Sequence, residues 1–189
     1  MFKFPSYHQL DSMDCGPTCL RIIAAHYGRI WPLQTLRDKC HISREGVSLL
    51  GISDAAESIG FRTMGAKISF SQLSEEAVLP CVAHWNQKHF IVVYKIEHHR
   101  GQTWIYVSDP ASGLLRYSKE DFLKSWLSIR PNDTENDANE GLGVVLLMEP
   151  TPKFYEEKGD EEHHKGISGL LKYLRPYKQF IAQLFLAML

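Results

Sequence analysis

The feature that most constrains this chain is a cysteine at the start of a predicted helix. Cys15 is followed by Gly16 and Pro17, and the apolar residues from there to Tyr27 recur at spacings that favour one helical face. Pro17 falls in the first turn, where its missing N–H costs nothing. Gly28 is placed to end the helix in the left-handed conformation. The Cys15 thiol is therefore predicted to lie at the positive end of a helix dipole, which favours the thiolate.

A helix terminus alone does not ionise a thiol. A free cysteine has a pKa of about 8.5, so a mostly ionised thiol at neutral pH needs a pKa lower by roughly two units, or about 2.7 kcal/mol. The dipole supplies about 0.3–1 kcal/mol, and up to about 2 kcal/mol in a partly buried site. If Cys15 is a nucleophile, a positioned histidine has to supply the remainder.

Composition limits the class of protein. The 189 residues are enough for one domain with a core and an appendage, and a net charge of −1 is ordinary for a globular chain. No basic stripe or nucleic-acid-binding motif is visible, so no nucleic-acid partner is predicted. The four cysteines match neither a disulfide framework nor a metal-ligand spacing, so we predict no metal or cofactor. No signal peptide directs this part of the chain out of the cytoplasm.

Helical patterns come before strand patterns. Three further helices are predicted at residues 32–40, 48–59 and 118–127, with a short helical connection at 71–77. Alternating or β-branched runs predict strands at residues 62–68, 79–85 (with Pro80 near the strand edge), 90–96, 104–107, 114–117 and 142–148, with a polar loop at 132–141. The order predicts an α+β fold, in which N-terminal helices pack on an antiparallel sheet.

Three regions are predicted along the chain. Residues 1–150 form the domain, and residues 151–166 form a charged, solvated linker because prolines, glycine and acidic residues cluster there. Residues 167–189 are amphipathic and basic, then apolar. Ten apolar residues are too few to span a bilayer, which needs about twenty, but the basic and tyrosine flank is typical of a segment that leads into a membrane helix. We expect the start of a truncated transmembrane region; the alternative is an amphipathic helix packed on the domain.

His89 is the preferred partner for Cys15. It opens the most β-rich run of the chain and follows a polar turn, so its ring is predicted to project from a rigid strand end. His84, in the neighbouring predicted strand, is the main alternative. Asp109 follows strand 104–107, and if that strand forms a hairpin with the strand after His89, the two side chains meet and the carboxylate orients the imidazole. The alternative role of Asp109 is that of a simple turn residue.

A site for acyl transfer also needs donors for the tetrahedral oxyanion. Gln9 lies six residues before Cys15, and its side-chain amide is a candidate donor beside the Cys15 backbone N–H. The alternative for Gln9 is an ordinary surface residue.

Several motifs occur in a fixed order along the chain: Gln9, then Asp14-Cys15-Gly16-Pro17-Thr18-Cys19-Leu20, Gly46-Val47-Ser48-Leu49-Leu50, His89-Phe90-Ile91-Val92-Val93 and Asp109-Pro110-Ala111. Together they resemble the bacteriocin-processing peptidase domain of peptidase-containing ABC exporters, a papain-like cysteine peptidase. The resemblance covers residues 1–150. It implies that Cys15 is the nucleophile and His89 the general acid and base. It also implies that Asp109 orients His89 and that Gln9 is the oxyanion donor.

The same resemblance implies a function. Such a domain is a cysteine endopeptidase that cleaves leader peptides after a double-glycine motif, without a cofactor, and an ABC transporter then exports the mature bacteriocin-like peptide. The implied partners are the leader peptide and the transmembrane and ATPase domains of the exporter; no phosphate-binding G-x-x-x-x-G-K-[ST] loop is present in these residues. The implied location is the cytoplasmic face of the bacterial inner (plasma) membrane, with membrane contact through the C-terminal segment.

Two other functions stay open. A catalytically silent domain that only binds the leader peptide is disfavoured because Cys15, His89, Asp109 and Gln9 are all present. Another papain-like thiol acyltransferase uses the same thiol and histidine, and the sequence separates it poorly from a peptidase. A redox or metal-binding role for the cysteines is disfavoured by their spacing.

Overall fold

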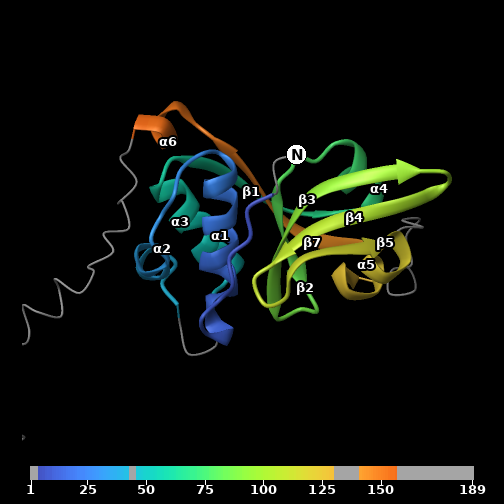
Figure 1. Cartoon of the computed structure of the whole chain (residues 1–189), viewed down its shortest axis with the longest axis horizontal. Helices are drawn as coiled ribbons and strands as arrows, with labels where there is room; N and C mark the ends of the chain where they lie inside the picture. The colour runs from blue at the N-terminus through green and yellow to red at the C-terminus, as the bar shows by residue number, and fades with distance from the viewer. Residues whose placement is uncertain (1–3, 43–45, 130–140, 157–189) are drawn as a thin grey trace, which may run out of the picture.

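The computed structural model describes residues 4–42, 46–129 and 141–156 (Figure 1). In chain order the elements are η1 (Ser12–Asp14), α1 (Cys15–His26), α2 (Leu33–Lys39), α3 (Leu49–Ser58), β1 (Phe61–Ile68), α4 (Phe70–Glu75), β2 (Cys81–Trp85), β3 (His89–His99), β4 (Gln102–Asp109), β5 (Gly113–Ser118), α5 (Lys119–Trp126), β6 (Leu127–Ile129), β7 (Leu142–Pro150) and α6 (Pro152–Glu156). Helices followed by an antiparallel sheet confirm the predicted α+β class.

The strands form one antiparallel sheet in the order β1-β7-β2-β3-β4-β5, with β6 paired to β7. Successive side chains of a strand point to opposite faces, and β3 uses both. Phe90 and Val92 join the buried cluster that contains α1 and α3, whereas Ile91 and Val93 join the cluster that contains Phe70 of α4 and the aromatic residues of α5. Helices α1 to α3 therefore cover one face, and α4 and α5 cover the other (Figure 1).

Helix α1 ends as its sequence predicts. Tyr27 is the C-cap, and Gly28 follows with φ of +85°. The Gly28 N–H donates to the Ala25 carbonyl at 3.1 Å, and the Arg29 N–H donates to the Ala24 carbonyl at 2.9 Å. A left-handed residue at this position lets the last carbonyls of the helix find donors. Glycine reaches that conformation without the steric cost of a Cβ atom.

Several boundaries differ from those expected. Pro80 lies outside the sheet, because β2 begins at Cys81 and pairs with β3 on one side and β7 on the other. The helix predicted to include Leu127 ends at Trp126, and the short strand β6 begins at once. A strand of three residues is too short to show an alternating pattern. Residues 132–140 of the predicted loop lie outside the described residues.

The prediction of a solvated linker at residues 151–166 is wrong for residues 151–156. Pro152–Glu156 form helix α6, and Phe154 is fully buried against the rings of Phe61 and Tyr27, with centroids 4.5 and 6.5 Å away. Thr151 also donates to the Gly60 carbonyl from its N–H and from its hydroxyl, at 3.0 and 2.6 Å, so this segment is bound to the domain. Residues 157–166, and the amphipathic segment expected at 167–189, lie outside the described residues. No helix within residues 4–42, 46–129 and 141–156 has the length and apolar content of a membrane span.

Truncation of Phe154 tests whether α6 belongs to the domain. We expect Phe154→Ala to lower the free energy of unfolding by about 3–5 kcal/mol, since it removes a buried ring and leaves a cavity. Tyr155→Ala is the matched control, because Tyr155 is 53% exposed, and we expect it to cost less than about 1 kcal/mol. Urea unfolding followed by tryptophan fluorescence measures both. Equal losses in the two variants would show that α6 is not part of the core.

Candidate active site

His89 and Asp109 meet where β3 begins and β4 ends. The ladder pairs Val92 with Ser108, so continuing it places Ile91 opposite Asp109 and makes His89 the diagonal neighbour of Asp109 on one face. His89 Nε2 lies 2.7 Å from Asp109 Oδ1, and the two side chains are 20% and 10% exposed. The structure thus brings together two residues that the sequence placed at the ends of one hairpin.

Asp109 is held by its own turn. Its Oδ1 also accepts a hydrogen bond from the Ala111 N–H at 2.8 Å, and the Ser112 N–H donates to the Asp109 carbonyl at 3.2 Å. Burial on its own raises the pKa of a carboxyl group, but the hydrogen bonds from His89 and Ala111 outweigh it and lower the pKa of Asp109. Asp109 is therefore a fixed carboxylate at neutral pH.

Cys15 is the first residue of α1 and is 5% exposed. Its side chain is near enough to His89 to affect the pKa of the imidazole. Burial on its own lowers the pKa of His89, but the hydrogen bond with Asp109 and the interaction with Cys15 outweigh it and raise that pKa to about 9. A protonated imidazole therefore lies beside the Cys15 side chain at neutral pH.

The position of Cys15 depends on close packing at the next residue. A Cβ atom on Gly16 would lie 2.4 Å from Val47 Cγ1 and 2.8 Å from the end of the Ile52 side chain. Only a residue without a side chain lets α1 approach α3 this closely. Gly16 thus fixes how α1 sits on its neighbours, and with it the position of the thiol.

Gln9 reaches the site through the backbone. The N-terminal segment runs alongside α1 toward η1 (Figure 1), where the Gln9 N–H donates to the Pro110 carbonyl at 2.9 Å. Farther back, Ser108 Oγ donates to the Pro5 carbonyl at 3.2 Å. Gln9 Oε1 is buried and has no hydrogen-bond partner among the described residues. Gln9 is thus anchored beside Asp109 while its side-chain oxygen is left without a partner.

His84 and the other three cysteines make different contacts from those of His89 and Cys15. His84 stacks on Phe90 with ring centroids 5.0 Å apart, and burial lowers its pKa. Cys19 donates to the Phe90 carbonyl at 3.3 Å, and burial, then Cys15, raise its pKa well above the ordinary value. Burial also raises the pKa of Cys40 and of Cys81 to about 12. These three thiols therefore stay protonated at neutral pH.

Sequence reasoning missed the residue directly before the thiol. Asp14 is fully buried, its Oδ1 lies 3.2 Å from Arg37 Nε, and its Oδ2 accepts a hydrogen bond from the Asp11 N–H at 3.2 Å. An aspartate at a helix N-cap is common and carries no signal of its own. Only the arginine, which arrives from α2, distinguishes this carboxylate.

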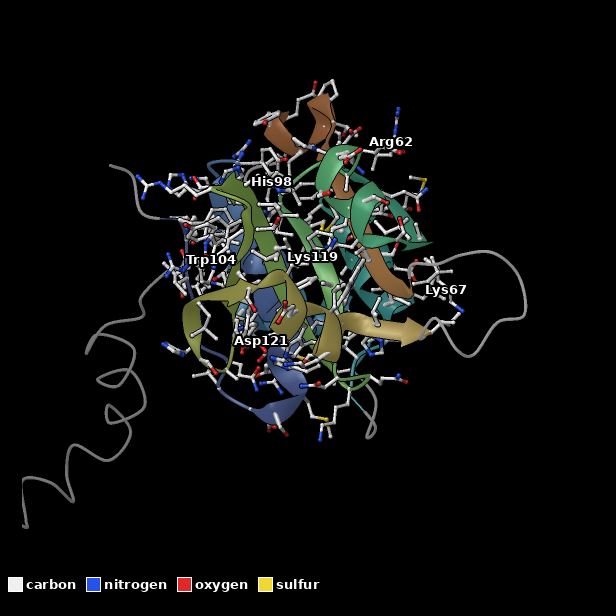
Figure 2. The ribbon with its side chains drawn as sticks, turned by 90° about the vertical axis from the view of Figure 1, so that its right-hand side faces the viewer. Arg62, Lys67, His98, Trp104, Lys119 and Asp121 are labelled. Atoms are coloured by element: carbon white, nitrogen blue, oxygen red, sulfur yellow. The ribbon has the colours of Figure 1, made fainter. Side chains whose placement is uncertain are left out.

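A hollow at the other end of β4 is separate from this site. Trp104 and Lys119, labelled in Figure 2, line it together with the residues around Gly101. Because Trp104 lies near the start of β4 and Asp109 at its end, the hollow does not adjoin the thiol. Within the described ranges, no group of three or more histidine, cysteine, aspartate or glutamate side chains is arranged to hold a metal ion.

Comparison with known proteins gives concordant results. The Peptidase C39 family matches residues 3–134. The chain is 32% identical over 185 residues to the Colicin V secretion/processing ATP-binding protein CvaB of Escherichia coli. This match covers 97% of this chain and 23% of that protein. It is 28% identical over 193 residues to the transport/processing ATP-binding protein ComA of Streptococcus pneumoniae. This match covers 99% of this chain and 24% of that protein. The chain thus spans about a quarter of the length of these curated relatives.

Solved structures agree with the fold. A double glycine motif protease from an AMS/PCAT transporter, crystallised in complex with the leader peptide, superposes with a TM-score of 0.66 at 28% identity, over 79% of this chain and 93% of that one. The peptidase domain of Streptococcus ComA gives a TM-score of 0.63 at 25% identity, over 79% of this chain and 100% of that one.

The pKa of His89 predicts how stability depends on pH. The ring titrates at about 9 when folded and near 6.5 when unfolded, so its contribution is complete below about pH 6.5 and is lost as pH rises through 9. We expect the free energy of unfolding to fall by roughly 3 kcal/mol more in the wild type than in His89→Gln between these limits. Urea unfolding across the pH series measures the difference.

His84→Gln is the control for that series. Since the pKa of His84 is lowered by burial, its contribution is lost only as pH falls, and the alkaline limb of the curve should stay as in the wild type. Parallel curves for the wild type and His89→Gln would contradict the raised pKa.

Proposed function

The chain belongs to the Peptidase C39 family, and on that premise we propose that it is a cysteine endopeptidase that cleaves leader peptides after a double-glycine motif. Cys15 is the nucleophile, and His89 is the general acid and base. Asp109 orients His89, and Gln9 stabilises the oxyanion. The observation that carries the proposal is that His89 is hydrogen-bonded to Asp109 and interacts with the side chain of Cys15, the first residue of α1.

The first step is the attack of the thiolate on the peptide carbonyl. Asp109 accepts a hydrogen bond from His89 Nε2–H, which leaves Nδ1 to hold the proton that Cys15 gives up. The thiolate then forms a bond to the carbonyl carbon, and the carbonyl oxygen becomes an oxyanion. His89 next protonates the departing amine, so that the C–N bond breaks and the acyl group remains on Cys15.

The second step regenerates the thiol. Neutral His89 removes a proton from water, the resulting hydroxide attacks the thioester carbon, and the leader is released as a carboxylate while Cys15 regains its proton from His89. Both steps pass through a tetrahedral oxyanion. We infer that Gln9 stabilises this oxyanion, since its backbone is anchored to the Pro110 carbonyl and its side-chain amide carries N–H donors.

The burial of the nucleophile supports a substrate with glycines at the scissile bond. Cys15 is 5% exposed at the first position of α1, so a carbonyl carbon reaches its sulfur only when the substrate backbone comes close to the protein. A residue without a Cβ atom brings its backbone closer to the protein than any other residue does. A pair of glycines therefore suits this approach better than side-chain-bearing residues.

The partners and location follow from the relatives. CvaB and ComA are described as secretion or transport and processing ATP-binding proteins, and we infer that this chain likewise acts with the transmembrane and ATPase domains of an ABC exporter. It would then work at the cytoplasmic face of the bacterial inner membrane and release a bacteriocin-like peptide for export. Membrane contact through residues 167–189 is part of this proposal.

The test is cleavage of a synthetic double-glycine leader peptide under reducing conditions, followed by mass spectrometry. We expect a single cut after the second glycine, none with Cys15→Ala, and a rate at least about 10³-fold lower with His89→Ala. His84→Ala is the matched control and should retain activity. Tight binding without a cut would favour a leader-binding module, and transfer of the acyl group to an added amine in place of hydrolysis would favour an acyltransferase.

Removal of the Gln9 amide tests the oxyanion donor. We expect Gln9→Ala to lower kcat by about 10²–10³-fold with little change in KM, because the donor acts on charge that develops only in the transition state. Gln102→Ala removes an exposed glutamine at the far end of β4 and should leave kcat unchanged. A rise in KM with unchanged kcat in Gln9→Ala would assign the residue to substrate binding.

A further inference from the structure

The carboxylate next to the nucleophile is buried and paired. Asp14 is the N-cap of α1, but its side chain makes no cap hydrogen bond to that helix. It turns back to accept from the Asp11 N–H, and its other oxygen lies 3.2 Å from Arg37 Nε. Asp14 is fully buried, whereas the Arg37 side chain is 34% exposed. The arginine therefore reaches from solvent to a carboxylate that has no exposure of its own.

These contacts determine where α1 starts. Asp14 and Asp11 close the single turn η1, in which the Asp14 N–H donates to the Asp11 carbonyl at 3.0 Å. The ion pair with Arg37 ties this turn to α2. Because Cys15 is the next residue after η1, any loosening of the turn moves the thiol relative to His89.

The same contacts set the charge around the thiol. The ionisable groups near the Cys15 side chain are His89 from β3, Asp109 behind it from β4, and Cys19 one turn farther along α1. Asp14 is the preceding residue in the chain and adds a buried carboxylate next to the nucleophile. Cys19 stays protonated. Two carboxylates against one imidazolium would oppose a thiolate, since like charges in a buried site disfavour ionisation. Arg37 supplies a second positive charge, so two carboxylates are matched by two cations.

We propose that Asp14 and Arg37 are positioning residues for the peptidase reaction: the pair fixes the turn that delivers Cys15, and the guanidinium offsets the negative charge of Asp14 beside the attacking thiolate. The proposal rests on the proposed role of Cys15 as the nucleophile. In this proposal Arg37 of α2 contributes to the reaction indirectly, through its ion pair with Asp14.

The test is the rate of Cys15 alkylation by iodoacetamide as a function of pH, with the modified residue identified by mass spectrometry. We expect Arg37→Gln to raise the midpoint of this profile by about one pH unit, and to lower kcat/KM for the leader peptide about tenfold at neutral pH. Arg37→Lys keeps the charge and should recover most of the wild-type midpoint. Arg62→Gln removes an arginine of β1 (Figure 2) and should leave the profile unchanged.

A double variant separates charge from structure. Asp14→Asn combined with Arg37→Gln removes both charges, keeps an acceptor for the Asp11 N–H, and should return the midpoint toward that of the wild type. If Arg37→Gln alone does not fold, the comparison of Arg37→Lys with the double variant decides, because both must then show a low midpoint. An Arg37→Gln protein with reduced thermal stability but a wild-type midpoint would overturn the proposal.

The wild-type profile tests the underlying function separately. A wild-type midpoint near that of a free thiol, about 8.5, would overturn the role of Cys15 as an activated nucleophile. A low wild-type midpoint that Arg37→Gln does not move would overturn only the role of the Asp14–Arg37 pair.

Discussion

The hydrogen bond between His89 Nε2 and Asp109 Oδ1 depends on the register of a single hairpin. A slip of one residue between β3 and β4 would turn Asp109 to the other face of the sheet. Such a slip of β4 would also turn Ile105 and Val107 out of the buried cluster to which they belong. The register is therefore enforced by the core that β4 helps to form. The irregularity between Val93 and Lys95 is confined to the part of the hairpin away from the site.

The helical layer has a comparable role for Cys15. Residues on several sides of α1 are buried, including Cys19, Ile22 and Ile23, so the helix is gripped by the sheet and by its helical neighbours. A helix held in this way cannot rotate without opening voids in a close-packed interior. The geometry at the thiol is thus set by the packing of the whole first third of the chain, and few contacts at the site itself are needed.

Local signals account for what the sequence could predict. The start of α1 and its end at Gly28 are encoded by neighbouring residues, and His89 and Asp109 follow from the ends of one hairpin. The anchoring of Gln9 to Pro110 and the reach of Arg37 to Asp14 join segments that are distant along the chain, and no periodicity reports them. Phe154 was missed for a different reason: one buried ring among charged neighbours does not alter the average polarity of its segment.

The bond from the Gln9 N–H to the Pro110 carbonyl couples two parts of the molecule that move on their own in most proteins. Pro110 directly follows Asp109, so the N-terminal segment and the β4–β5 turn share one short backbone connection. Fraying of a chain end is ordinarily a local event of low free energy. Here the same opening would also release the turn that holds Asp109. The mobility of the N-terminal segment and the mobility of the Asp109 side chain should therefore increase together, as in one cooperative unit.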